Sequence, residues 1–419
     1  MWHGVITEFD EIDWQNIFPN NIEVKNEIVE TYKELAPWYS KLKKPHTKEI
    51  SSLFTTPFTN HSNSNLLDKD LYVMSKPLRT HSIFRDLKKK KLINLYENCI
   101  AIELQDCKKS DRKTKFLKYY QDGEIKELYG DIFIVSCGAL ETPRLILQSQ
   151  ESNNFSCNKE YIGTNLIDHP WTVVGEISST RPILTNHFDI DSNELSYRRG
   201  HNILIKDDQD IKNHCVMYRP YQFGNIKNIK NILTKLIVSR SLKTWTKLFR
   251  QFNLLDIFST VIYMISEKYN LTFLNFKCAI YIYMDQKSSS KSSLSLSSEK
   301  DNFGRNIPII NWLHGQEEQE DIKQVDAILK EEFRNNVFFK YSSKKDLWKE
   351  LSSGSHHAGT MKIDLNRKGV IDENLKMHDK ENLFICDLSI FPRFGNSNPT
   401  YTLSAFSLRL GKHIFKNYS

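Results

Sequence analysis

A chain of 419 residues in which 39% of the side chains are hydrophobic and 26% are charged has the composition of a folded globular protein, which excludes an intrinsically disordered one. The 58 basic side chains outnumber the 51 acidic ones only modestly, so the net charge of +7 gives no argument for nucleic-acid binding. The length exceeds what one core ordinarily serves, and it predicts two subdomains or one large interrupted fold.

The first third of the chain is predicted to contain a helix, a loop and a short β meander. The helix begins near Asn20 and stops near Pro37, and the Ser/Thr/Asn-rich residues 51–80 are expected to form a loop. Alternation in LINLYENCIAIELQ, residues 92–105, is typical of a strand. Asp122-Gly123 lies at the position of a hairpin turn, which completes the meander.

Residues 131–149, DIFIVSCGALETPRLILQS, combine a strand, a turn and a helix. Ile132–Val135 predict a buried strand, residues 136–139 a tight turn of small side chains, and Leu140–Ser149 a helix with Pro143 in its first turn. In α/β folds such a turn brings backbone amides close to a nucleotide, although many such turns bind nothing.

The middle of the chain, residues 171–345, is expected to be a sheet with helices over one face. Strands are predicted at 278–286, 294–298 and 307–313, with a hairpin turn at 301–305 and helices at 221–268 and 316–337. Within the first helix, Lys227–Arg250 carries basic and apolar side chains and no acidic one. A helix with a solvated basic face is the plainer interpretation, and peripheral contact with an anionic membrane surface is the alternative.

The last seventy residues return to α/β character. NLFICDLSIF, residues 382–391, predicts a buried strand that contains Asp387, a loop rich in turn formers follows, and residues 401–415 predict a helix. Asp387 and Asn398 therefore fall near a strand end and its following loop, where α/β folds hold ligands.

The cysteines, the N-terminus and the most apolar stretch of the sequence indicate in which cellular compartment the protein is expected. The seven cysteines show no CxxC spacing, which favours free thiols in a reducing compartment over disulfides or a metal site. The N-terminus lacks a signal-peptide pattern, and the most apolar window, from Leu254, is too short to span a bilayer. The cytoplasm is therefore the expected location.

The stretch SGSHHAGTMK, residues 353–362, carries two adjacent histidines ahead of a Gly-Thr pair. Oxidising an alcohol removes a hydride from C–H and a proton from O–H, so a base must lie near the hydroxyl, and an imidazole is suited to this near neutral pH. An uncharged amide can orient the hydroxyl without disturbing that base. His356 and Asn398 could take these two roles, although a lone loop histidine is more often a surface residue.

Three segments resemble the glucose-methanol-choline (GMC) oxidoreductases, which are FAD-dependent alcohol oxidases and dehydrogenases. The C-terminal stretch has His-x-x-Gly-Thr at 356–360, then GVIDENL, NLFICDLSIFP and Asn-Pro-Thr before a final helix, in the order of the family signature. GALETPRLIL, residues 138–147, resembles a second signature, and IGTNLIDHP, residues 162–170, resembles a Gly-x-Asn-Leu-x-Asp-His-Pro segment.

The resemblance implies roles for individual residues. His356 matches the catalytic base, His357 falls on a variable position, and Asn398 matches the second active-site residue. His169 is interpreted as a structural turn residue. The implied cofactor contacts are the turn at Gly138 and Ala139, the ribityl and phosphate side at Asp387 and Leu388, the isoalloxazine side at Pro399 and Thr400, and an adenine-side contact at Ile100.

Two departures from the family pattern matter. The sequence contains no Gly-x-Gly-x-x-Gly, the motif that lets a helix N-terminus meet the FAD pyrophosphate, and WHGVITEFDEIDW resembles a segment that normally follows that unit. Residues 362–364, Lys-Ile-Asp, stand where Arg-Met-Gly is usual. The implied domains are a partial FAD-binding domain at 1–170, a substrate domain at 171–345 and a return to the first domain at 346–419.

The function that this resemblance implies is an FAD-dependent oxidation of CH–OH groups. The donor is expected to be a sugar or other polyol, with His356 as base and hydride passing to flavin N5. The alternative is an inactive remnant, or a partner subunit of a split flavoenzyme whose separate N-terminal fragment binds the FAD. The individual alcohol and the electron acceptor stay open.

Overall fold

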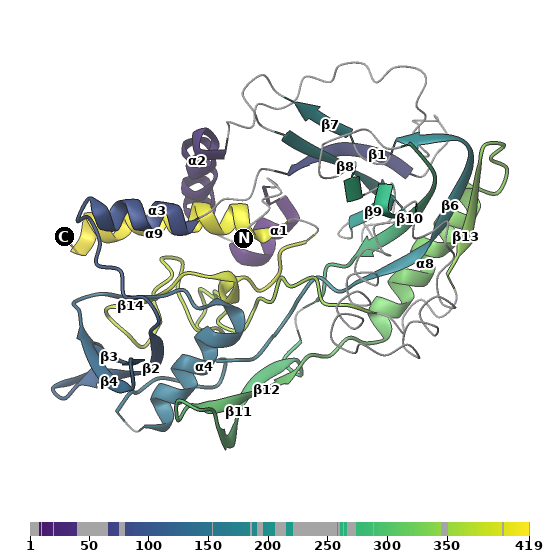
Figure 1. Cartoon of the computed structure of the whole chain (residues 1–419). Coiled ribbons are helices and arrows are strands. Elements are labelled where there is room, and N and C mark those ends of the chain that lie inside the picture. The colour runs from purple at the N-terminus through teal and green to yellow at the C-terminus, as the bar shows by residue number, and fades with distance from the viewer. Residues whose placement is uncertain are drawn as a thin grey trace, which may run out of the picture.

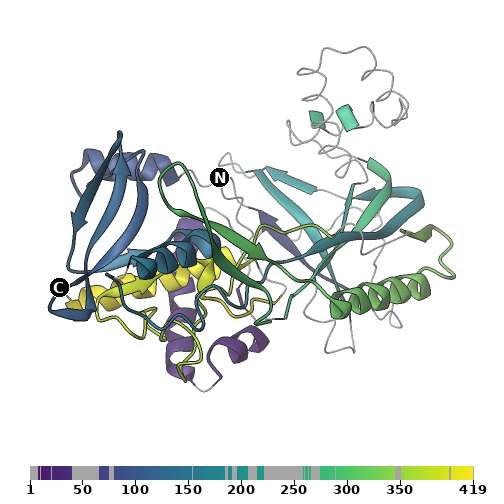
Figure 2. The same ribbon diagram turned by 90° about the horizontal axis from the view of Figure 1, so that it is seen from below.

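The protein is described by a computed structural model in which two lobes lie side by side (Figures 1 and 2). The described residues are 8–9, 11–19, 21–39, 66–74, 80–152, 154–184, 187–190, 196–205, 215–220, 258, 260–262, 264–265, 274–287, 289–344, 351–395 and 398–418. One lobe is built on a large antiparallel sheet, and the other combines helices with small sheets.

The large sheet has seven strands in the order β1-β8-β9-β10-β6-β13, with β7 paired to β8. Each pairing in it is antiparallel. The strands are β1 (Leu66–Met74), β6 (Trp171–Leu184), β7 (His187–Ile190), β8 (Ser196–Ile205), β9 (Cys215–Pro220), β10 (Leu274–Tyr283) and β13 (Phe339–Ser343).

Helix α8 (Gln316–Glu332) covers one face of this sheet. Its apolar residues Ile322, Val325 and Leu329 recur at helical spacing and are almost fully buried. The helix contacts β13 and β6, and its apolar residues share one hydrophobic cluster with Cys278 and Ile280 of β10, which are completely buried. This cluster gives the sheet lobe its own core.

The second lobe contains three small sheets and most of the remaining helices. The meander is β2 (Ile100–Cys107), β3 (Ser110–Gln121) and β4 (Glu124–Tyr129); the parallel pair is β5 (Phe133–Val135) and β14 (Leu383–Ile385); and the hairpin is β11 (Ser293–Lys300) and β12 (Asn306–Asn311). The helices are α1 (Glu11–Ile17), α2 (Ile22–Tyr39), α3 (Thr80–Lys89), α4 (Gly138–Glu151), η2 (Leu388–Ile390) and α9 (Pro399–Tyr418).

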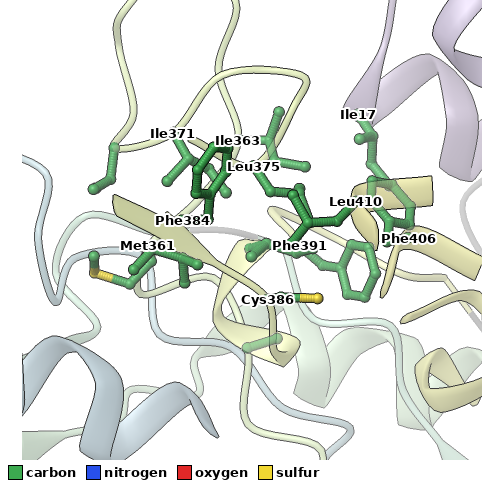
Figure 3. Packing of buried hydrophobic residues seen from close by; sticks show 14 of the residues in the cluster. Ile17, Met361, Ile363, Ile371, Leu375, Phe384, Cys386, Phe391, Phe406 and Leu410 are labelled. Atoms are coloured by element: carbon green, nitrogen blue, oxygen red, sulfur yellow. The ribbon is translucent and has the colours of Figure 1, made fainter. Parts of the chain in front are cut away.

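The core of this lobe is assembled from both ends of the chain. The Phe406 ring of α9 stacks on the rings of Trp14 and Phe18. Phe391 packs edge-on against the Phe406 ring, with 5.3 Å between the two ring centroids. Figure 3 shows Ile17, Phe391 and Phe406 within this cluster. Because α1 and the C-terminal segment share one core, the loop that follows β14 is held from two sides.

Several predicted elements are confirmed. The helix that stops near Pro37, the meander, the hairpin turns at 122–123 and 301–305, and the last two helices all form. Asp122 and Gly123 have φ values of 52° and 91°, as a two-residue turn with both central residues in the left-handed region requires. The fold is mixed α/β, while the domain boundaries at 170 and 345 stay predictions.

Four local predictions are wrong. Residues 66–74, expected in a loop, form β1, and the strand expected from residue 92 begins only at Ile100. The strand expected over 382–391 is limited to β14, because Asp387 caps the 3-10 turn η2 through Ser389 N. The β11–β12 hairpin also pairs separately from the large sheet, and Leu294 of β11 donates its backbone N–H to the Gly163 carbonyl instead.

Some predictions lie outside the described residues. These include the basic segment 227–250, most of the helix expected at 221–268, and residues 2–7 of the WHGVITEFDEIDW start. Among the described helices, none is long and apolar enough to cross a membrane.

Candidate active site

Two segments far apart in the sequence pair at the candidate site. Ile167 and Ala358 exchange backbone hydrogen bonds of 3.1 and 2.9 Å, and Trp171 and Ser352 exchange bonds of 2.9 and 3.0 Å. These two bridges enclose residues 168–170 of one segment, which include His169, and residues 353–357 of the other, which include His356. The antiparallel pairing therefore brings the NLIDHP and HHAGT segments together.

Gly359 allows this close approach. Its φ is +85°, in the left-handed region, and a Cβ added there would lie 2.1 Å from the Asn165 carbonyl oxygen. An L side chain meets both a conformational cost and a direct clash, which is why a glycine follows His356 by three positions. The neighbouring Thr360 carbonyl then accepts a 2.8 Å bond from Gly163 N.

The two histidines meet through their rings. His356 Nδ1 lies 3.2 Å from His169 Nδ1, and His169 Nε2 lies 2.6 Å from the Gly395 carbonyl oxygen. The Phe394 ring stands edge-on to His169, with 4.4 Å between the centroids. The loop before Asn398 therefore lies against the same histidine that contacts His356.

Asp168 holds the backbone around this pair. One carboxylate oxygen accepts the N–H groups of His169 at 2.7 Å and His356 at 2.8 Å, and the other accepts the Ser353 hydroxyl at 2.5 Å. The second oxygen also lies 3.8 Å from His357 Nε2. Because the Asp168 side chain is buried and its oxygens are committed to these donors, it fixes the turn rather than presenting a free carboxylate.

The protonation of His356 suits a base. Burial lowers the pKa of the His356 imidazole below its ordinary value, the negative charge of Asp168 raises it, and His357 lowers it further. Burial is the largest of these effects, and it favours the neutral form of the His356 imidazole. An unprotonated imidazole has one ring nitrogen available to accept a proton.

Asn398 is placed less completely than His356. It is partly exposed, directly precedes α9, and follows Gly395 by three residues. Its loop therefore approaches the two histidines through Phe394 and Gly395. That its amide faces the same space as the His356 ring stays a prediction.

The predicted cofactor turn between β5 and α4 is held by Asp387. Its buried carboxylate accepts from Gly138 N at 3.0 Å and from the Thr142 hydroxyl at 2.5 Å, and its other oxygen accepts from Ser389 N at 2.9 Å. Asp387 thus joins the turn to η2, in which Leu388 is the half-buried first residue. Its contact with a ribityl or phosphate group stays a prediction.

The proline in α4 explains a second tie to the active-site turn. The helix begins at Gly138 rather than at Leu140, so Pro143 lies beyond the predicted first turn and supplies no N–H to the carbonyl of Ala139. The Thr360 hydroxyl donates to that carbonyl instead, at 2.7 Å. The HHAGT segment therefore supplies a hydrogen bond that α4 cannot make.

The start of α4 leaves open space beside Gly138. Gly138 has φ of +84° with no atom within 4 Å of an added Cβ, and Cys137 makes no side-chain cap at the helix N-terminus. The first N–H of α4 is instead taken by the Asp387 carboxylate, so the feature that remains is the open space beside Gly138. Of the other predicted contacts, Ile100 begins β2, Ala139 is buried in the first turn of α4, and Pro399 and Thr400 begin α9.

Replacing Gly138 with Ala tests this part of the site. The left-handed φ makes any side chain cost about 1–2 kcal/mol in stability, and the new methyl group would enter the space beside the turn. We expect the Kd for FAD to rise by about tenfold or more, equivalent to about 1.4 kcal/mol. Gly304→Ala is the matched control, because Gly304 has φ of +77° and also no atom within 4 Å. Equal FAD affinity in the two variants would remove Gly138 from the cofactor contacts.

Asp168 and Thr360 were not singled out from the sequence. Both belong to segments that resemble family motifs. The available signals were the position of Asp168 directly before His169 and that of Thr360 directly after Gly359. Gln286 gave no such signal. It accepts from Asp168 N at 3.1 Å and from Trp312 Nε1 at 2.8 Å, and thereby links the turn to the sheet lobe.

Comparison with known proteins agrees with this architecture. Residues 288–407 match the family model described as GMC oxidoreductase, a range that contains His356, Asp387 and Asn398. This part of the chain is therefore a GMC oxidoreductase C-terminal domain.

Among solved structures, the chain is similar to pyridoxine 4-oxidase from Mesorbium loti. The TM-score is 0.51 at 12% sequence identity, and the similarity covers 83% of this chain and 65% of the other, so the chain spans about two thirds of that protein's length. At this identity the likeness shows the fold alone. No curated protein matches the sequence.

Proposed function

We propose that this chain forms the substrate-binding and catalytic part of an FAD-dependent oxidoreductase that acts on CH–OH groups. The observation that carries the proposal is His356, a partly buried imidazole with a lowered pKa, fixed on a turn by Asp168 and Gly359 within the matched domain. A histidine with a perturbed pKa that is held by specific contacts is a candidate for a functional residue. The polar central loops favour a sugar or another polyol as the donor.

The side chains divide the work between the hydroxyl and the cofactor. His356 accepts the hydroxyl proton on a ring nitrogen, and Asn398 orients the same hydroxyl through its amide. FAD, when bound, supplies the hydride acceptor. The residues that would hold it are Ile100, Gly138, Ala139, Asp387, Leu388, Pro399 and Thr400.

The lowered pKa of His356 predicts the pH dependence of turnover. The base works only when unprotonated, so activity is complete above its pKa and falls as the pH drops through it. We expect the acid limb of kcat/KM to have an apparent pKa below the value of about 6.5 for a free imidazole. A pH profile with its acid limb at or above that value would contradict the burial argument.

A second candidate is a partner subunit that does not retain FAD by itself, or an inactive remnant. Two observations support it. The sequence has no Gly-x-Gly-x-x-Gly, and the parallel β5–β14 sheet has only two short strands among the described residues, fewer than a dinucleotide-binding sheet ordinarily has. The pyrophosphate of FAD ordinarily depends on such a glycine-rich turn. In this case a separate fragment with the βαβ unit would complete the cofactor site.

Titration with FAD separates the two candidates. The purified chain is mixed with FAD alone, and in parallel with FAD and a candidate glycine-rich N-terminal fragment, and flavin retention is measured by visible absorbance after gel filtration. Each mixture is then assayed with a panel of sugars and polyols and an artificial electron acceptor. Retention with turnover by the chain alone supports the first candidate, and turnover only with the fragment supports a split enzyme. Retention and turnover in neither mixture would contradict the proposed oxidoreductase.

A further inference from the structure

We propose that His169 is a positioning residue that fixes the tautomer of His356, so that Nε2 of His356 is the nitrogen that accepts the proton. The inference starts from three groups in a row. Gly395 O lies 2.6 Å from His169 Nε2, and His169 Nδ1 lies 3.2 Å from His356 Nδ1. Its catalytic meaning rests on the proposed function, whereas the hydrogen-bond chain itself does not.

The direction of the chain follows from its first member. A backbone carbonyl oxygen can only accept, so His169 Nε2 must carry the hydrogen that it donates to Gly395. His169 is only 4% exposed and has the Phe394 ring against it, and we take its imidazole to be neutral. A neutral His169 with its hydrogen on Nε2 has a lone pair on Nδ1, which must therefore accept.

The second contact then sets the tautomer of His356. Two ring nitrogens at 3.2 Å form a hydrogen bond only if one of them donates, so His356 Nδ1 carries the hydrogen. The neutral ring of His356 consequently has its lone pair on Nε2. The base nitrogen is thus selected by a second histidine, in the way that a hydrogen bond at one ring nitrogen generally decides the role of the other.

The backbone keeps these three groups in register. Asp168 accepts the backbone N–H of both histidines, so their relative position depends on one buried carboxylate. A Cβ on Gly354 would lie 2.4 Å from the His169 carbonyl oxygen, and a Cβ on Gly395 would lie 2.3 Å from the Asp13 carboxylate. Both glycines therefore permit close approaches that hold the histidine chain between the active-site turn and the loop before Asn398.

Two near-isosteric replacements of His169 test the inference. The amide oxygen of His169→Asn can take the place of Nδ1 as acceptor, whereas His169→Leu has a similar shape and no acceptor. The tautomers are measured by ¹⁵N-histidine NMR of the purified chain, and the His356 signals are identified by their loss in His356→Gln. In the wild-type protein we expect the His356 hydrogen on Nδ1, with a scalar coupling to His169 Nδ1 across the hydrogen bond.

The variants have distinct expected results. His169→Asn should keep the hydrogen on Nδ1 of His356, and His169→Leu should move it largely to Nε2. In the flavin-loaded enzyme, His169→Leu should lower kcat by about 100-fold with little change in KM, and His169→Asn should recover most of that loss.

A wild-type spectrum with the His356 hydrogen on Nε2 would overturn the inference, even if the leucine variant does not fold. An unchanged tautomer in folded His169→Leu would overturn it as well. The NMR readout needs neither flavin nor substrate. The expected tautomers in a protein without turnover would therefore support the hydrogen-bond chain and contradict the proposed function. Turnover that depends on His356, in a protein with the opposite tautomer, would support the proposed function and contradict the hydrogen-bond chain.

Discussion

We expect His356→Gln to lower kcat for the proposed alcohol oxidation by about 10²–10⁴-fold, because the hydroxyl proton loses its acceptor. Glutamine preserves a polar side chain of similar reach but cannot take up a proton near neutral pH. The His356 backbone N–H still donates to Asp168, so we expect the turn to stay folded. The measurement is steady-state turnover of the flavin-loaded variant, with the FAD Kd measured in parallel.

His357→Gln is the matched control for this variant. The two histidines are adjacent in sequence, but His357 is the one whose ring lies 3.8 Å from Asp168 Oδ2, and His356 is the one whose ring contacts His169. We expect a much smaller loss of kcat for His357→Gln. If both variants lose turnover equally, or only the His357 variant does, the base is wrongly assigned.

We expect Gly359→Ala to destabilise the protein by about 2–5 kcal/mol. The left-handed φ of +85° costs about 1–2 kcal/mol for an alanine, and the added Cβ would lie 2.1 Å from a backbone oxygen in a segment that cannot shift alone. Urea unfolding measured by circular dichroism gives the change in the free energy of unfolding.

Gly123→Ala separates the two contributions. Gly123 has φ of +91° and no atom within 4 Å of an added Cβ, so it bears the conformational cost without the clash. We expect a loss of about 1–2 kcal/mol there. A Gly359 variant no less stable than the Gly123 variant would show that the NLIDHP and HHAGT segments do not pack as closely as described.

Local patterns predicted those parts of the fold that short-range physics decides. Asp122-Gly123 specifies a hairpin turn by backbone conformation alone, and the apolar spacing of α8 and α9 specifies helices. Strand β1 could not be predicted in the same way, since it forms by pairing with β8, more than a hundred residues away. The β14 strand was predicted too long because a side chain, Asp387, ends it.

The candidate site was predicted by motif and completed by tertiary contacts. The spacing of His356 and Gly359 was visible in the sequence, but the reason for the glycine is the Asn165 carbonyl, which only the fold brings near. His169 was interpreted as a structural turn residue, and its contact with His356 depends on the pairing of Ile167 with Ala358. Partners so distant in sequence leave no local pattern.

Anaerobic mixing of the flavin-loaded protein with a polyol that it turns over tests the central claim most directly. The wild-type protein should lose its visible flavin absorbance in a single exponential phase, and His356→Gln should lose it at least about 100-fold more slowly while binding FAD equally well. Equal rates of flavin bleaching in the two proteins would contradict a base at position 356.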